Sequence, residues 1–193
     1  MIILASESPR RKELLKRIVP DFITVAPCVE ELESGGNLTE LPEKNAILKA
    51  RAVAERFPDA WVIGSDTAVF ADGRMLGKPG SEEEAVSMLS ALSGRAHEVI
   101  SGAAVICLRQ EVCRSWSTVS KVFFKTLDPG EIALYMKKVH VLDKAGAYAI
   151  QEHAGLLGAR WEGELENIIG LPLTELTQVL MDLKIIETAS GRE

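Results

Sequence analysis

Apolar and polar positions along the chain follow two periods, one typical of strands and one typical of helices. Short apolar runs predict strands at residues 2–5, 22–25 and 61–63, and those at 2–5 and 61–63 are expected to be buried. Apolar stripes at helical spacing predict helices at 9–18, 42–57, 82–92, 128–138 and 172–183. Residues 99–108 and 112–124 suit an antiparallel pair, and weaker patterns suggest strands at 147–150 and 156–161 and a loop over 164–172. This order predicts an α/β protein with a mixed, twisted sheet flanked by helices.

The first candidate for chemistry follows the apolar run at 61–63. Asp66 stands where that strand is expected to end, and ligands of open α/β sheets bind at the carboxyl ends of strands. A metal or an attacking water could be held there, with Thr67 and Lys78 close in sequence. The pair Asp72-Gly73 is a strong turn signal, so the same stretch also predicts a β-hairpin. On this pattern alone, a turn or capping role for Asp66 remains an alternative.

The helix predicted at residue 9 begins with an unusual charge pattern. Ser8 suits the N-cap position, and Pro9 suits the first helical position. Arg10 and Arg11 then place two cations at a helix end that already carries partial positive charge. A bound anion would offset this cost, because free N–H groups, hydroxyls and guanidinium groups would converge on it. The pattern favours an anion site over the alternative of two solvated arginines.

Composition and charge narrow the class of protein. The 193 residues, 47% of them hydrophobic, suit one medium domain or a domain with a small lobe. A net charge of -6 argues against broad binding to nucleic acid or anionic membranes, but not against a phosphate-bearing small molecule. The three cysteines lack metal-ligand spacing, and no signal peptide or membrane-length apolar run is found. We therefore expect a cytoplasmic globular protein with reduced thiols and no nucleic-acid or membrane partner.

Several known phosphate-binding and hydrolase motifs are matched only in part or are absent. Residues 73–79 imitate a P-loop, but the glycines are one residue too close and Pro79 replaces the metal-binding Ser or Thr. No G-x-G-x-x-G follows a strand, and no G-x-S-x-G is present. Ala68 stands where a phosphatase that forms a phosphoaspartate would be expected to carry a second Asp. The sequence therefore disfavours four classes: P-loop nucleotide-binding proteins, dinucleotide-binding proteins, serine hydrolases with a G-x-S-x-G motif, and phosphatases that form a phosphoaspartate.

The remaining polar groups fit a nucleotide better than any other substrate. Glu31 lies in an acidic loop, and Lys49 lies at the border of the apolar stripe of helix 42–57; a solvated loop and a surface lysine are the ordinary alternatives. Gln151 follows the strand predicted at 147–150. Carboxylates without a His or Cys cluster suit Mg²⁺ or Mn²⁺, and an amide suits a nucleobase edge. Together these groups indicate a nucleotide phosphohydrolase.

Seven motifs, taken in order, resemble those of one family. The chain resembles Maf-type nucleoside triphosphate pyrophosphatases over nearly its whole length, and its Lys-Ala-Gly-Ala-Tyr…Gln segment resembles the branch that acts on dTTP and UTP. The motifs are Ala5-Ser6-Glu7-Ser8-Pro9-Arg10-Arg11, Lys49-Ala50, Gly64-Ser65-Asp66-Thr67, Gly77-Lys78-Pro79, Leu92-Ser93-Gly94-Arg95-Ala96-His97, Asp143-Lys144-Ala145-Gly146-Ala147-Tyr148-Ala149-Ile150-Gln151 and Gly170-Leu171-Pro172.

The resemblance implies a fold, a reaction and a set of site residues. The fold would be two-lobed with a deep central cleft, like that of inosine triphosphatases, in a single domain over residues 1–193. The reaction would need a divalent metal, Mg²⁺ or Mn²⁺, and would release a nucleoside monophosphate and pyrophosphate. Asp66 falls on the proton-acceptor position, and Glu31 is expected to hold the metal with it. Positions tied to substrate choice are Arg10, Thr67 and Gln151, and those expected to hold phosphates or metal are Ser8, Arg11, Glu31, Lys49 and Lys78.

Three departures from the family pattern and one competing class remain. Glu7 replaces a usually small residue, Leu165 stands where the family often has Tyr, and Ser120 replaces a common Thr. The first two leave the preferred nucleotide open among dTTP, UTP and modified pyrimidine nucleotides. A monomer and a homodimer are both compatible with the sequence. The competing class is a non-catalytic nucleotide-sensing regulator of cell division, which the retention of every group needed for hydrolysis disfavours.

Overall fold

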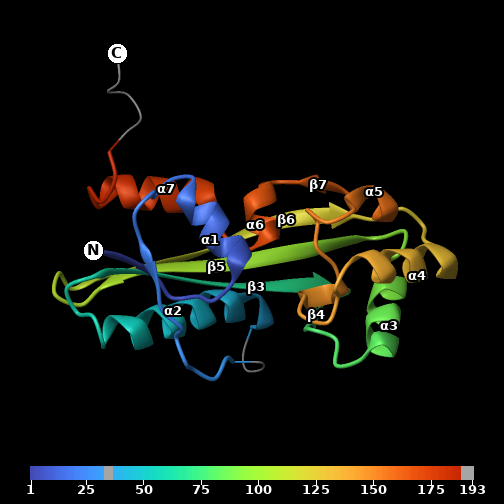
Figure 1. Cartoon of the computed structure of the whole chain (residues 1–193), viewed down its shortest axis with the longest axis horizontal. Coiled ribbons are helices and arrows are strands. Elements are labelled where there is room, and N and C mark those ends of the chain that lie inside the picture. The colour runs from blue at the N-terminus through green and yellow to red at the C-terminus, as the bar shows by residue number, and fades with distance from the viewer. Residues whose placement is uncertain (33–36, 188–193) are drawn as a thin grey trace, which may run out of the picture. The chain divides into compact units, whose positions relative to one another are not determined.

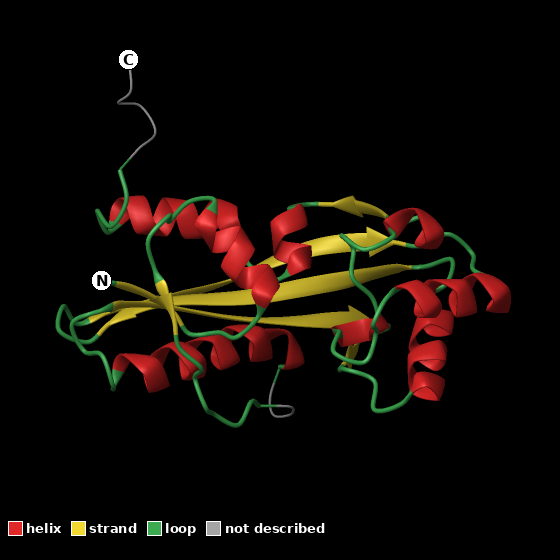
Figure 2. Ribbon diagram, in the orientation of Figure 1, coloured by secondary structure: helices red, strands yellow, loops and turns green. Residues whose placement is uncertain are grey.

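The computed structural model of the protein describes residues 1–32 and 37–187. Within them, seven strands form one mixed sheet in the order β2-β1-β3-β5-β6-β7, with β4 paired to β3 (Figures 1 and 2). The strands are β1 (Ile2–Leu4), β2 (Ile23–Thr24), β3 (Trp61–Ala71), β4 (Arg74–Leu76), β5 (Ala96–Cys107), β6 (Val112–Phe123) and β7 (Arg160–Glu162). The helices are α1 (Pro9–Lys16), α2 (Leu41–Ala54), α3 (Glu82–Leu92), α4 (Pro129–Lys138), α5 (Ala154–Leu157), α6 (Leu165–Ile169) and α7 (Leu173–Asp182), with short 3-10 turns η1 (Leu38–Glu40) and η2 (Ala145–Ala147).

The predicted fold class and most of the predicted elements are confirmed. β1 runs parallel to both β2 and β3, whereas β3–β4 and β6–β7 are antiparallel, so the sheet is mixed. The hairpin predicted at Asp72-Gly73 joins β3 to β4, and both turn residues have positive φ (49° and 73°). Such a pair matches the twist of the flanking strands. None of the helices in the described part of the chain is long and apolar enough to cross a membrane.

Three predictions near the C-terminal third are wrong. Residues 147–150 form no strand, because Gly146 and Ala147 have positive φ (69° and 62°) and turn the backbone out of an extended path. The strand predicted at 156–161 begins only at Arg160, since the apolar residues before it form α5. The loop predicted over 164–172 contains α6, whose five residues are too few to give a helical period in the sequence.

The chain divides into two compact units. The first unit comprises Met1–Asp66, Gly102–Ser117 and Gly170–Glu193, and the second comprises Thr67–Ser101 and Thr118–Ile169. Each unit has its own hydrophobic core, formed in the first by α2 against β1, β3 and β5 and in the second by residues from α3, α4 and the strands beside them. The division matches the expectation of two lobes, while the expected central cleft and the single domain over residues 1–193 stay predictions.

In the first unit, helices cover both faces of the sheet. Figure 1 shows α1 and α7 on one face and α2 on the other. The stripe that predicted α2 is the buried one: Ala46, Ala50 and Val53 are fully buried against the strands. Gly64 lets this helix approach β3 closely, because a Cβ atom there would lie 2.3 Å from the carbonyl oxygen of Ala46. The glycine that marks a strand boundary in the sequence pattern is therefore a packing residue inside a longer strand.

Replacing Gly64 by Ala tests this close packing. The added methyl group meets helix backbone, which cannot move aside alone, so we expect a loss of roughly 1–3 kcal/mol in the free energy of unfolding. Urea denaturation measures the change. Gly155→Ala is the matched control, since no heavy atom lies within 4 Å of a Cβ built there, and its stability is expected to stay the same or rise. Equal destabilisation of the two variants would contradict the assignment.

The second unit contains a cluster of buried aromatic side chains. The rings of His97, Phe124 and Tyr148 pack edge to face, with centroids 4.9 to 5.3 Å apart. His97 Nε2 and Tyr148 Oη form a hydrogen bond of 2.8 Å. Burial lowers the pKa of His97 to about 4, so its imidazole is neutral at pH 7. His97 therefore has the environment of a structural residue in the core of the second unit.

Candidate functional site

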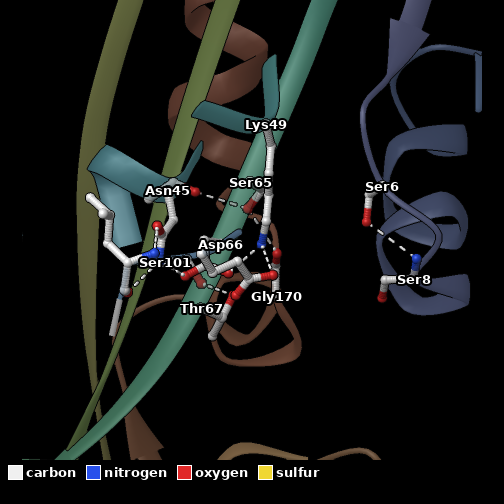
Figure 3. A network of polar contacts seen from close by, with 12 residues as sticks. Ser6, Ser8, Asn45, Lys49, Ser65, Asp66, Thr67, Ser101 and Gly170 are labelled. Atoms are coloured by element: carbon white, nitrogen blue, oxygen red, sulfur yellow. Dashed lines mark hydrogen bonds and ion pairs between the residues drawn. The ribbon is translucent and has the colours of Figure 1, made fainter. Parts of the chain in front are cut away.

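The centre of the candidate site is a cluster of two carboxylates and one ammonium group in the first unit. Strand β3 carries Asp66, and helix α2 carries Lys49 (Figure 3). Lys49 Nζ lies 2.7 Å from Asp66 Oδ1 and 2.8 Å from Glu31 Oε1. The Lys49 side chain is only 7% exposed, so the ordinary reading of a surface lysine is wrong. The buried ammonium group of Lys49 therefore carries one positive charge that faces the two negative charges of Glu31 and Asp66.

Asn45 completes the support of Asp66, and sequence reasoning missed it. Its Nδ2 atom donates to Asp66 Oδ2 at 3.3 Å and to the carbonyl of Leu32 at 3.1 Å. Its Oδ1 atom accepts from the backbone N–H of Leu32 at 2.7 Å, which ties the acidic loop to α2. Asparagine is a weak helix former, so its presence in the interior of the predicted helix was the one sequence signal that Asn45 has a specific role. One carboxylate oxygen of Asp66 therefore accepts from the ammonium group of Lys49, and the other accepts from the amide of Asn45.

The position of Asp66 in the strand differs from the prediction. β3 does not end near Asp66 but continues to Ala71, so the residue lies in the middle of the strand. The strand continues because the polar side chains on either side of Asp66 find hydrogen-bond partners. Ser65 Oγ donates to the carbonyls of Gly102 and Gly170, and Thr67 bonds to Ser101. An apolar run alone therefore underestimated the length of β3.

The start of α1 adds a second cation to this unit, the half-buried guanidinium of Arg11. Ser8 is the N-cap and accepts from Arg11 N, and the first turn of the helix has no acidic residue. Arg11 Nε donates to the carbonyl of Gly170 at 2.8 Å. Burial lowers the pKa of the Arg11 guanidinium, while Asp66 and Glu31 raise it. Arg11 therefore lies in the electrostatic field of both carboxylates. Arg10 and Arg11 are both half-buried.

The other three predicted residues belong to the second unit. Thr67 Oγ1 lies 2.8 Å from Ser101 Oγ, which in turn donates to the carbonyl of Asn167. Lys78 is exposed and follows β4. Gln151 is exposed as well, in a turn rather than at the end of a strand. Ser101, like Asn45, carried no motif that would have singled it out.

The donor set of the cluster fits a hard divalent cation. In the described part of the chain, no group of three or more His, Cys, Asp or Glu side chains could hold a metal ion by itself. Asp66 and Glu31 nevertheless both reach a single cationic atom, the ammonium nitrogen of Lys49. Mg²⁺ is usually held by one or two carboxylates together with substrate phosphates rather than by an all-protein cage. The two carboxylates therefore fit such an ion in the presence of a triphosphate.

Comparison with solved structures first defines the fold. The structure of the Ham1 protein of Staphylococcus aureus aligns with a TM-score of 0.53, over 94% of this chain and 98% of that one. The two sequences are 16% identical, so the likeness concerns the fold alone. It agrees with the mixed α/β class derived from the pattern of elements.

Comparison with sequences then gives the family. A family model described as Maf-like protein matches residues 1–183, and the chain belongs to this family. A protein of Symbiobacterium thermophilum is 43% identical over 93% of this chain and 92% of its own. Proteins of Akkermansia muciniphila (42% identical, 94% and 96% covered) and Thermococcus gammatolerans (44%, 90% and 91%) are similar to the same extent. All three are named dTTP/UTP pyrophosphatase.

Proposed function

We propose that the protein is a nucleoside triphosphate pyrophosphatase that hydrolyses dTTP and UTP to the nucleoside monophosphate and pyrophosphate. The observation that carries the proposal is the fixed carboxylate of Asp66, held by Lys49 on one oxygen and by Asn45 on the other. Membership of the Maf family and the names of relatives more than 40% identical to the chain support the same reaction.

Asp66 is the group proposed to activate water. A carboxylate whose rotation is fixed by two hydrogen bonds can orient a water molecule and accept its proton as the water attacks. The attack forms a bond from the water oxygen to the α-phosphorus. The bond from that phosphorus to the bridging oxygen breaks, and pyrophosphate leaves with the electron pair. Asn45 and Lys49 hold the base in place during this step.

Cationic side chains would offset the charge that develops on the phosphates. Arg11 is suited to this role because its Nε donates to the Gly170 carbonyl and its Nη1 to Ser6 Oγ at 3.5 Å, which fixes the plane of a guanidinium near both carboxylates. Ser8, Arg10 and Lys78 are assigned to the triphosphate on their positions in the family motifs, and Thr67 and Gln151 to substrate choice. The two arginines then differ in role, with Arg11 the electrostatic partner of the carboxylates.

Asp66 and Glu31 would hold the divalent cation, Mg²⁺ or Mn²⁺. Such an ion, when bound, offsets the negative charge of the triphosphate and of the leaving pyrophosphate. Lys49 already keeps the two carboxylate groups together, which reduces the reorganisation needed for them to share a ligand.

A product analysis with a nucleotide panel tests the proposal. The purified protein is incubated with Mg²⁺ and UTP, dTTP, CTP, ATP or a modified pyrimidine triphosphate, and the products are separated by ion exchange. We expect monophosphate and pyrophosphate from UTP and dTTP, and no turnover after EDTA treatment until Mg²⁺ or Mn²⁺ is restored. Diphosphate and inorganic phosphate as products would overturn the proposal. A tight nucleotide complex without turnover would favour the nucleotide-sensing regulator instead.

A further inference from the structure

Gln151 occupies one position of a tight turn in the second unit. The backbone N–H of Glu152 donates to the carbonyl of Ala149 at 3.1 Å, which closes a four-residue turn with Gln151 third. The Gln151 side chain is exposed, whereas Ala149 and Ile150 before it are buried. An exposed amide therefore projects from a turn whose first half lies in the core.

The first residue of this turn is held by a single buried phenol. Tyr135 Oη accepts a hydrogen bond from Ala149 N at 3.0 Å and donates one to Ala149 O at 3.3 Å. Tyr135 is fully buried on α4. Burial raises its pKa to about 12, so the phenol keeps the proton that it donates. One side chain thus fixes both polar groups of the residue two positions before Gln151.

The last residue of the turn is held from the other side. Lys144 Nζ lies 3.7 Å from Glu152 Oε1, and it also contacts the His140 carbonyl at 2.6 Å and Asp143 Oδ1 at 2.9 Å. The Lys144 side chain is 6% exposed, so its ammonium has little freedom to leave this cluster. The backbone three residues before the turn is tied to the segment before Lys78, because Gly146 N donates to Gly77 O at 3.0 Å.

We propose that Tyr135 is a positioning residue that sets nucleobase selectivity by holding the turn from which Gln151 projects. The inference rests on the proposed function and on Gln151 as the residue that reads the base. A glutamine amide can rotate and present its donor and acceptor in either order. It therefore discriminates between base edges only if the backbone that carries it is fixed. Tyr135 fixes this backbone through its hydrogen bonds to Ala149, without contacting substrate. Lys144 supports the other end of the turn through Glu152.

Tyr135→Phe is the direct test, because it removes the hydroxyl and retains the ring. The measured quantity is the ratio of kcat/KM for UTP to kcat/KM for CTP. We expect this ratio to fall by roughly tenfold, the effect of losing one geometry-fixing polar contact. A residue that serves stability alone would lower the melting temperature and leave the ratio unchanged, which would overturn the inference.

A double-mutant cycle shows whether Tyr135 acts through Gln151. Gln151→Ala should lower the ratio by itself, and Tyr135→Phe should lower it no further in the Gln151→Ala background. Independent, additive effects would overturn the inference, as would a normal ratio in Gln151→Ala. These results differ from failure of the proposed function, which would show as a wild-type protein that releases no pyrophosphate from UTP.

Two further variants separate positioning from stability. Ile106→Val truncates a buried residue in the core of the first unit, so it should lower the melting temperature without altering the ratio. Lys144→Met keeps the buried stem and removes the ammonium, so it should lower the ratio in the same direction as Tyr135→Phe. If Tyr135→Phe fails to fold, Lys144→Met decides: a folded Lys144→Met protein with an unchanged ratio would refute the role of the held turn.

Discussion

Asp66→Asn is expected to lower kcat for UTP hydrolysis by roughly 10²–10⁴-fold, the range typical of a lost general base. The asparagine side chain has nearly the same shape and can still accept from Lys49, but its amide cannot take a proton from water. Its new NH₂ group would face the Asn45 amide, so we also expect a modest loss of about 1–2 kcal/mol in the free energy of unfolding. Steady-state assays and thermal denaturation measure the two effects.

Asp72→Asn is the matched control for this substitution. Asp72 lies in the turn after β3, is 75% exposed and pairs with Arg95 on the surface, so kcat should stay within about twofold of wild type. Rapid turnover by a folded Asp66→Asn protein would exclude Asp66 as the base. Equal losses in the two variants would point to damage of the strand rather than of the chemistry.

Lys49→Met is expected to cost both activity and stability. Its removal leaves Asp66 and Glu31 close together without the ammonium group that they share. Breaking a buried ion pair costs about 3–5 kcal/mol, and the half-exposure of Glu31 lowers our estimate to roughly 2–3 kcal/mol. For a domain of this size, that corresponds to a fall in melting temperature of about 4–12 °C. We expect kcat to fall by roughly 10²-fold, because Asp66 loses its orientation.

The same helix offers the control for Lys49. Lys44 forms an exposed pair with Glu40 one turn away, and its replacement by Met should change the free energy of unfolding by less than about 0.5 kcal/mol. Activity should remain at the wild-type level. A Lys49→Met protein as stable as Lys44→Met would show that the buried ammonium contributes nothing to folding.

Local patterns predicted the elements whose signals lie within a few residues. The Ser8-Pro9 start of α1 and the Asp72-Gly73 turn are both found as predicted. The first depends on the Ser8 side chain as a cap and on the fixed φ of Pro9, and the second on the tolerance of Asp and Gly for positive φ. Such local preferences survive in the folded protein.

Elements and site features that depend on distant partners were not predictable in this way. The length of β3 depends on hydrogen bonds from Ser65 and Thr67 to residues that lie at least 34 positions away. Asn45 was missed because its importance arises from a fold that places the acidic loop beside α2. The residues 147–150 have strand propensity, yet the turn geometry at Gly146 and the hydrogen bonds of Tyr135 to Ala149 override it.

The environment of each acidic or basic site residue depends on the residues with which it pairs in the folded protein. The sequence indicated Glu31, Lys49 and Asp66 as separate candidates, and the structure brings them into one ion-pair cluster. Glu33 to Gly36 complete the acidic loop in the sequence but lie outside the described residues. The difference between Arg10 and Arg11 depends on the carbonyl of Gly170, which no pattern near the arginines could reveal.

The bond between Arg11 and Gly170 also has a consequence for the newly made protein. The two residues are 159 positions apart, and a ribosome that adds about 5–20 residues per second needs roughly 10–30 s to travel from one to the other. Once residue 66 has been added, the growing chain contains Glu31, Lys49 and Asp66, but Arg11 still lacks the Gly170 acceptor that orients it. A nascent chain that ends before residue 170 therefore cannot assemble the complete site, and competence for hydrolysis is acquired late in synthesis.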